Sequence, residues 1–145
     1  MIEQLSIFMQ NKEGHLSKVL RILSEDDINI QSLTISETGE YGIMRLIVSE
    51  TEKAMTALKS NRVLCNITPV FAVSIPNRPG AMLQFVDLLS SKDLSIEYAY
   101  SYPSTNDAIS VIVFKIDRKK WTNVEEILQN FENASLLDQE SLLKL

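Results

Sequence analysis

The feature of this chain of 145 residues that most restricts its fold is an internal repeat. The pattern Asn-x-x-Gly occurs at Asn11–Gly14 and again at Asn77–Gly80, an offset of 66 residues. The same offset aligns apolar positions on both sides of the motif without a gap, as expected of a duplicated structural unit. The aligned pairs include Leu5 with Phe71, Ile7 with Val73, Met9 with Ile75, Val19 with Phe85, Leu23 with Leu89, Ile28 with Leu94 and Ile30 with Ile96. The sequence therefore predicts two copies of one small fold.

The first copy shows the apolar spacing of strands and helices in alternation. Apolar residues at Leu16, Val19, Leu20 and Leu23 recur at the spacing of one helical face. The segment Glu37–Gly42 holds two glycines among polar residues, which predicts a turn. We expect strands at 5–9, 28–36, 43–48 and 63–68 and helices at 16–23 and 51–60. The resulting order is β-α-β-β-α-β.

The second copy repeats this order up to its last segment. We expect strands at 71–75, 94–102 and 108–116, helices at 81–92 and 121–131, and a turn at 103–107, with residues 136–145 closing the chain. Such a unit predicts an α+β, ferredoxin-like fold, in which two helices cover one face of a four-stranded antiparallel sheet. We place the domains at residues 1–69 and 70–145, with Pro69 as the whole linker. Each core is small, so each unit needs to pack against the other or a second chain.

Composition and charge exclude several classes of protein. The net charge of −5 argues against direct binding of nucleic acid, because phosphate contacts depend on clustered Lys and Arg. We expect no membrane span, because no run of about 18 apolar residues is present. The N-terminus lacks the basic and apolar regions of a signal peptide, and Cys65 is the only cysteine, so a cytoplasmic location is expected.

The sequence offers little for catalysis. The only histidine, His15, and the only cysteine, Cys65, stand in unrelated contexts, so no metal-ligand cluster of these residue types is predicted. The motifs of phosphate-binding loops, dinucleotide-binding folds and serine hydrolases do not occur. We therefore expect a protein that is not an enzyme and that uses neither a metal nor a cofactor.

The repeated Asn-x-x-Gly motif precedes a predicted helix in both copies. The first N–H groups of a helix lack partners within the helix and carry partial positive charge, so a carboxylate can bind there. Gly14 or Gly80 would allow a ligand to approach the backbone closely, and Asn11 or Asn77 could hydrogen-bond its polar groups. The alternative is structural, because asparagine caps helices and glycine occurs in turns.

Both copies resemble ACT domains, the small ligand-sensing modules attached to enzymes of amino-acid metabolism. The resemblance rests on Asn77–Ala81 with the Leu-rich helix that follows, on Leu94–Ile96, on Asn11–Gly14, and on Asp27–Ile30, which is similar to the family's G-[IV]-N-I motif. It covers about residues 3 to 135. It implies side-by-side pairing of domains into an eight-stranded sheet. It also implies effector binding at the interface, between the first turn of one domain and the second strand across it.

The resemblance assigns candidate ligand-binding residues at matching positions. In the first copy they are Asn11, Gly14, His15, Leu16, Asn29 and Ile30, and in the second they are Asn77, Gly80, Ala81, Met82, Ser95 and Ile96. The sequence departs from the family pattern where Lys12–Glu13 replaces Arg-Pro and where Ser95 replaces Asn. The two sites are therefore expected to differ.

Three further groups of residues have simpler interpretations. Tyr98, Tyr100 and Tyr102 alternate along one expected strand and so share one face of the sheet, where they would pack or line a pocket. Cys65 and Trp121 fall on apolar patterns and are expected in the core.

The sequence thus predicts a sensor without catalytic activity that binds an amino acid and regulates a partner protein or enzyme of amino-acid metabolism. A homodimer is expected, because the fold must cover its sheet surface. The alternative is an interaction subunit whose ligand sites are degenerate and which acts only through assembly. The two hypotheses differ in whether an amino acid stabilises the protein.

Overall fold

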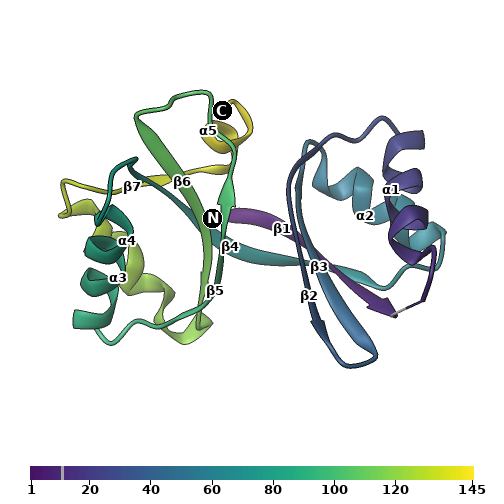
Figure 1. Ribbon diagram of the computed structural model, residues 1–145, viewed down its shortest axis with the longest axis horizontal. Coiled ribbons are helices and arrows are strands. Elements are labelled where there is room, and N and C mark those ends of the chain that lie inside the picture. The colour runs from purple at the N-terminus through teal and green to yellow at the C-terminus, as the bar shows by residue number, and fades with distance from the viewer. Residues whose placement is uncertain (11) are drawn as a thin grey trace. The chain divides into compact units, whose positions relative to one another are not determined.

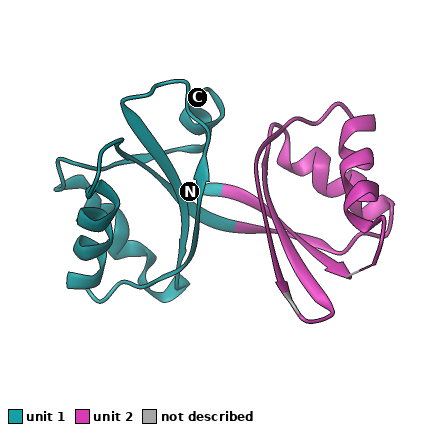
Figure 2. Ribbon diagram, in the orientation of Figure 1, with its two compact units in different colours: residues 1–2, 69–145 teal, residues 3–68 magenta. Residues whose placement is uncertain are grey.

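The structure is a computed structural model that describes every residue except Asn11, with only the backbone described at Thr38. The chain forms two compact units (Figure 2). The N-terminal unit comprises Glu3–Thr68, and the C-terminal unit comprises Pro69–Leu145 together with Met1–Ile2. They are unit 2 and unit 1 of Figure 2, respectively.

The N-terminal unit has the predicted order of elements. Its strands form an antiparallel sheet in the order β4–β1–β3–β2, and α1 and α2 cover one face of that sheet (Figure 1). The elements are β1 (Ile2–Gln10), α1 (His15–Glu25), β2 (Ile30–Thr38), β3 (Tyr41–Val48), α2 (Thr51–Ser60) and the first part of β4 (Cys65–Pro76).

The C-terminal unit repeats this arrangement. Its strands lie in the order β7–β4–β6–β5, all antiparallel, with α3 and α4 on one face (Figure 1). The elements are the second part of β4, α3 (Ala81–Ser91), β5 (Ile96–Tyr102), β6 (Ile109–Ile116), the 3-10 turn Arg118–Lys120, α4 (Trp121–Gln129), β7 (Ser135–Leu137) and α5 (Gln139–Leu143). Both units are therefore ferredoxin-like, and the predicted α+β fold class is confirmed.

Strand β4 corrects the predicted linker. The sequence predicts separate strands at 63–68 and 71–75 joined by Pro69, but one strand runs unbroken from Cys65 to Pro76 and takes part in both units. Proline is compatible with an extended chain because its φ is close to −65°, and it is tolerated in a strand where no ladder bond requires its missing N–H. The repeat boundary is thus inside a strand rather than in a connector.

Each unit has its own apolar core between helices and sheet. In α1 the buried positions are Val19, Ile22 and Leu23, so the inward face is rotated from the predicted one. Leu16, predicted on that face, is 36% exposed because it lies in the first helical turn. Cys65 is buried in the N-terminal core, as predicted.

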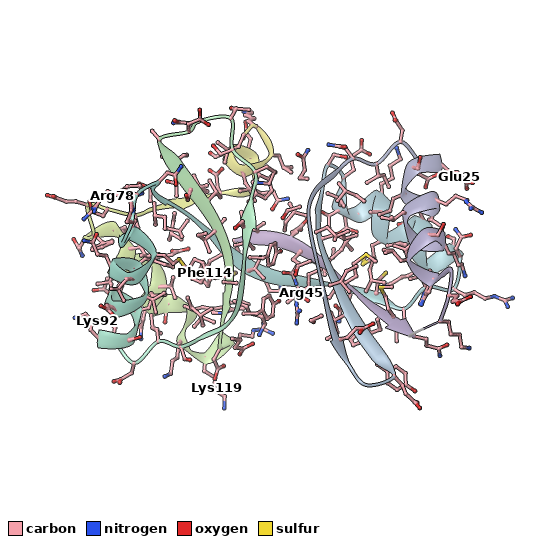
Figure 3. The ribbon with its side chains drawn as sticks, viewed as in Figure 1. Glu25, Arg45, Arg78, Lys92, Phe114 and Lys119 are labelled. Carbon is pink, nitrogen blue, oxygen red and sulfur yellow. The ribbon has the colours of Figure 1, made fainter. Side chains whose placement is uncertain are left out.

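Aromatic rings fill the C-terminal core. Phe114 lies between the sheet and the helices (Figure 3), with its ring centroid 5.2 Å from that of Phe85 and 5.7 Å from that of Phe71. Trp121 packs against this cluster, and its indole N–H donates to the Ile116 carbonyl at 2.9 Å. Ring pairs at these separations add to the stabilisation from burial. Trp121, predicted in the core, is partly buried at its border.

The three tyrosines of β5 share the other face of the C-terminal sheet. Tyr100 lies opposite Val113 and Tyr102 opposite Val111, whose side chains point away from the helices. Tyr102 is buried, and this burial raises the pKa of its phenol. The alternation in sequence therefore predicted the face correctly, and Tyr102 packs there.

Three helices end in the same hydrogen-bonded turn, with a residue other than glycine in the left-handed conformation. These residues are Asp27 (φ 56°), Arg62 (φ 61°) and Asp93 (φ 56°). After α1, the N–H of Asp27 donates to the Ser24 carbonyl and the N–H of Ile28 donates to the Leu23 carbonyl. This is a Schellman motif, which satisfies the last carbonyls of a helix.

Candidate ligand-binding site

The two predicted glycines occupy equivalent backbone positions. Gly14 has φ 80° and Gly80 has φ 85°, and each is the residue immediately before a helix. These angles lie in the left-handed region, which favours glycine because it has no Cβ. Open space surrounds both positions, since a Cβ built at either would meet no heavy atom within 4 Å. The glycines are therefore required by the turn, and they also leave the helix start accessible.

A cavity of about 640 Å³ opens beside Gly14 in the N-terminal unit. Its volume falls within the range of small-molecule sites. We call it the loop cavity, and its lining residues are Phe8, Met9, Gln10, Lys12, Glu13, Gly14, His15, Lys18, Tyr41, Arg62 and Leu64. They come from the end of β1, the following turn, the start of α1, the start of β3 and the segment between α2 and β4.

Exposed apolar side chains form one wall of the loop cavity. The N–H of Phe8 donates to the Leu64 carbonyl at 2.9 Å, and Phe8 lies opposite Ile43 on β3. Phe8 is 45% exposed, Leu64 69% and Tyr41 62%. Because Leu5 and Ile7 point into the helix-covered core, the alternation of β1 turns Phe8 to the other face. These exposed groups could contact the apolar part of a ligand.

Three of the described residues that line the loop cavity are cationic. Lys12, Lys18 and Arg62 line it, together with the carboxylate of Glu13. The Lys18 ammonium donates to the Asn61 carbonyl at 3.2 Å, a contact that holds this side chain beside the end of α2. Arg62 is placed by the Schellman motif that ends α2. These cations could pair with the carboxylate of a ligand.

His15 is fixed against the end of β1. Its Nδ1 lies 3.2 Å from the backbone nitrogen of Gln10 and 3.3 Å from the Gln10 carbonyl oxygen. If Nδ1 accepts the Gln10 N–H, the proton of the neutral ring is on Nε2, which then acts as a donor. The predicted ligand-binding candidates Gly14 and His15 are thus brought together on one cavity.

The equivalent turn of the C-terminal unit is held by its own hydrogen bonds. The Asn77 amide donates to the Asp107 carbonyl at 3.0 Å, and its oxygen accepts from the Ser110 hydroxyl at 3.2 Å. Arg78 donates to Gln84 at 3.2 Å. The candidates Gly80 and Met82 are exposed, whereas Ala81 is buried. Asn77, a predicted ligand contact, thus also ties this turn to the segment before β6 and to β6 itself.

The candidates on the second strands lie far from these turns within each unit. Tyr41, which lines the loop cavity, pairs with Gln10 on β1 and with Thr38 at the C-terminal end of β2. Ile30 lies at the opposite end of β2. At about 3.3 Å per residue the separation along β2 is about 25 Å. Asn29 precedes Ile30, and Ser95 and Ile96 occupy the same positions before and in β5. No single unit unites the two predicted groups.

Sequence reasoning missed most of the loop cavity. The candidate Asn11 lies outside the described residues. Phe8, Tyr41, Arg62 and Leu64 are distant in sequence, and only the sheet register brings them together. One signal was present in the sequence, because Phe8 breaks the polar alternation of Gln4 and Ser6 on the face away from the core.

The one cysteine, Cys65, is buried as a free thiol. Burial raises the pKa of the Cys65 thiol above its ordinary value of 9.0, with Lys59 opposing the shift. The described part of the chain contains no cluster of three or more His, Cys, Asp or Glu able to hold a metal ion. None of the described helices combines the length and apolar character needed to cross a membrane.

The whole chain matches one known protein family. The family model described as an ACT domain pair matches residues 1–145. The chain belongs to this family. Among solved structures, protein BT0572 from Bacteroides thetaiotaomicron is 38% identical, with 99% of this chain and 96% of that chain covered and a TM-score of 0.89. The expected resemblance to ACT domains is thereby confirmed for both units.

More distant similarities are to subunits of two enzymes. The regulatory subunit of aspartate kinase from Thermus thermophilus shares the fold, with 17% identity, coverage of 90% and 92% of the two chains and a TM-score of 0.61. The acetolactate synthase small subunit of Haemophilus influenzae is 29% identical over 69 residues, which are 48% of this chain. The match spans 42% of that subunit, less than half of its length.

Proposed function

We propose that this ACT domain pair is a sensor without catalytic activity, which binds a small carboxylate metabolite of the amino-acid class in the loop cavity and regulates a partner. The observation that carries the proposal is the loop cavity itself. It places the left-handed Gly14 and the ring of His15 beside cations and an exposed apolar wall. The N–H groups at the start of α1 add partial positive charge on the same side.

The names of the similar proteins support a regulatory role. Two of them are subunits of the enzymes aspartate kinase and acetolactate synthase, and the aspartate kinase subunit is named a regulatory subunit. We propose that this chain, in the same way, acts in the cytoplasm through a partner enzyme or regulator. Ligand binding would favour one arrangement of domains or subunits over another, because a ligand shifts an equilibrium by its differential affinity for the two states.

We further propose that a second copy of the chain pairs with strand β2. Leu33 and Ile35 lie at this edge of the sheet and are 42% and 40% exposed. The segment Ser32–Ser36 is nearly symmetric about Thr34, so a two-fold axis there would set Leu33 opposite Ile35 of the second copy. The sequence from Ile28 to Ser36 carries no charge that would discourage edge pairing.

A second candidate function is an interaction subunit whose ligand sites are degenerate. The turn of the C-terminal unit favours it, because Asn77 is already bonded to Asp107 and Ser110. If the N-terminal turn were equally closed, assembly would be the only function left. Binding of a small molecule in the loop cavity would distinguish the two hypotheses.

The test is a thermal-shift screen with the twenty amino acids and related carboxylates. A ligand at about 100 times its Kd adds about 2.7 kcal/mol to the stability of the folded state. For a chain of this size that corresponds to a rise in Tm of roughly 5–10 °C. We expect at least one compound to produce such a shift. No shift at millimolar concentrations would favour the interaction subunit.

A pair of variants locates the binding. Phe8→Ser removes the aromatic wall of the loop cavity and introduces the residue found at the equivalent position of the second unit, Ser74. Leu83→Ser removes an apolar side chain that is 63% exposed on α3 of the other unit and is not among the residues that line the cavity. The thermal shift should shrink in Phe8→Ser and persist in Leu83→Ser. An equal effect of both substitutions would contradict the proposed location.

A further inference from the structure

We propose that the loop cavity selects a ligand with net negative charge and an apolar side chain, namely a 2-oxo acid, over the amino acid with the same side chain. The inference rests on the proposed function, because it concerns the same cavity. It differs from the sequence-based expectation of an amino acid in one chemical group, the ammonium.

The balance of charge around the loop cavity favours an anion. An amino acid has one carboxylate and one ammonium, so it is neutral overall and needs an acceptor for its N–H groups. Among the described residues that line the loop cavity, Lys12, Lys18 and Arg62 are cations and Glu13 is the carboxylate. Glu40 lines a neighbouring hollow together with Lys12, and the cations still outnumber the carboxylates when it is counted. A positive field of this kind favours an anion over a zwitterion.

The hydrogen-bond donors of the loop cavity suit the acceptor groups of a 2-oxo acid. Lys18 uses one N–H on the Asn61 carbonyl, and an ammonium has three such donors. Arg62 offers a planar group with several donors, which suits a carboxylate. The adjacent carbonyl of a 2-oxo acid is a further acceptor for such donors, whereas the ammonium of an amino acid would be a competing donor.

The apolar wall of the loop cavity influences which side chain the ligand can have. Phe8, Tyr41 and Leu64 expose aromatic and branched groups on the same cavity. An apolar side chain on the ligand would remove apolar surface of this wall from water, which a second carboxylate would do less favourably. The wall therefore favours an apolar side chain over that of an acidic amino acid.

Matched ligands test the inference. Binding to the full chain would be measured by calorimetry for 4-methyl-2-oxopentanoate against leucine and for phenylpyruvate against phenylalanine, with glutamate as a third probe. Contacts between exposed charges are individually weak. We therefore expect each 2-oxo acid to bind about 3-fold to 10-fold more tightly than its amino acid, with a preference that shrinks as salt is added.

Each outcome has a distinct meaning. Equal or tighter binding of the amino acid overturns the inference and leaves the proposed sensor intact. Glutamate binding more tightly than both 2-oxo acids overturns the assignment of an apolar side chain. If no probe binds at millimolar concentration, the inference fails together with the proposed function of the cavity.

A charge-matched pair of variants completes the test. Lys12→Gln removes a cation from the loop cavity, whereas Lys53→Gln removes a cation that pairs with Glu50 on α2 outside it. Both variants change the net charge of the chain equally. Lys12→Gln should lower the preference for the 2-oxo acid about 3-fold, and Lys53→Gln should leave it unchanged. An equal loss in both variants would show that the preference reflects overall charge and would overturn the assignment to this cavity.

Discussion

The turns before α1 and α3 have the same backbone conformation but differ in most of the side chains around them that could contact a ligand. Gly14 and Gly80 have φ angles of 80° and 85°, and each stands immediately before its helix. Around Gly14 the chain places exposed Phe8 and Tyr41 on a cavity. The residues at the same offset in the second unit are Ser74 and Asp107.

This difference separates what the fold requires from what binding requires. A left-handed residue is needed wherever the strand turns into the helix, so glycine occurs in both units. The side chains around the turn contribute little to the core and are free to diverge. In the C-terminal unit Asn77 and Ser110 tie the turn to β6, whereas in the N-terminal unit Phe8 and Tyr41 are exposed beside the turn. The motif therefore identifies the turn, and only its surroundings identify a site.

The edge strands show a second difference of the same kind. Leu33 and Ile35 on β2 correspond to Ala99 and Ser101 on β5. The β5 edge also carries Glu97, which pairs with Lys115, and a proline follows the strand at position 103. Charges and prolines at an edge discourage pairing with another chain. The N-terminal unit is therefore the one that we expect to dimerise.

The largest expected effect comes from charging the β2 edge. The double substitution Leu33→Lys and Ile35→Lys would set like charges opposite one another in a dimer about Thr34. We expect the dimer Kd to rise about 100-fold, which corresponds to about 2.7 kcal/mol, as measured by sedimentation equilibrium.

The matched control changes the other edge. Ala99→Lys with Ser101→Lys introduces the same charges on β5 and should leave the dimer intact. Weaker association in both double variants would mean that net charge, rather than the β2 edge, controls assembly. A dimer that survives both would exclude β2 as the interface.

Most of the fold could be predicted because it depends on local patterns. The repeat and the apolar periods predicted the order of elements in both units, and the single face shared by Tyr98, Tyr100 and Tyr102 followed from alternation. Errors arose where the chain had no local signal. Proline at 69 resembled a linker, yet its geometry also suits the continuous strand Cys65–Pro76.

The candidate site was harder to predict because it depends on register. Gly14 and His15 were found from the motif, but Arg62 and Leu64 reach the same cavity only through the pairing of β4 with β1. Asn77 is predicted to contact a ligand, and sequence alone does not reveal that the Asp107 carbonyl lies within hydrogen-bond distance of it. Partners distant in sequence decide which polar groups remain available.

The two glycines provide the next test, since the comparison predicts equal costs. Gly14→Ala and Gly80→Ala place a Cβ in open space, so backbone strain at positive φ is the expected cost. Each should lower the free energy of unfolding by about 1–2 kcal/mol in urea titrations. Ser17→Ala, at an exposed position within α1, should have little effect. Clearly unequal costs at the two glycines would show that the turns are not equivalent.

The smallest expected effect is a gain in stability at the helix ends that both units share. Asp27 and Asp93 adopt φ of 56° after α1 and α3, a conformation that glycine adopts without steric cost. Asp27→Gly and Asp93→Gly should each raise the free energy of unfolding by about 0.5–1 kcal/mol, because the relief of strain exceeds the entropy lost by a more flexible unfolded chain. Asp26→Gly is the matched control, since it removes the same charge one residue earlier, where φ is −92°. That variant has no strain to relieve and should be less stable than the parent. A gain in Asp26→Gly equal to that in Asp27→Gly would assign the effect to the carboxylate at the helix C-terminus rather than to the left-handed backbone.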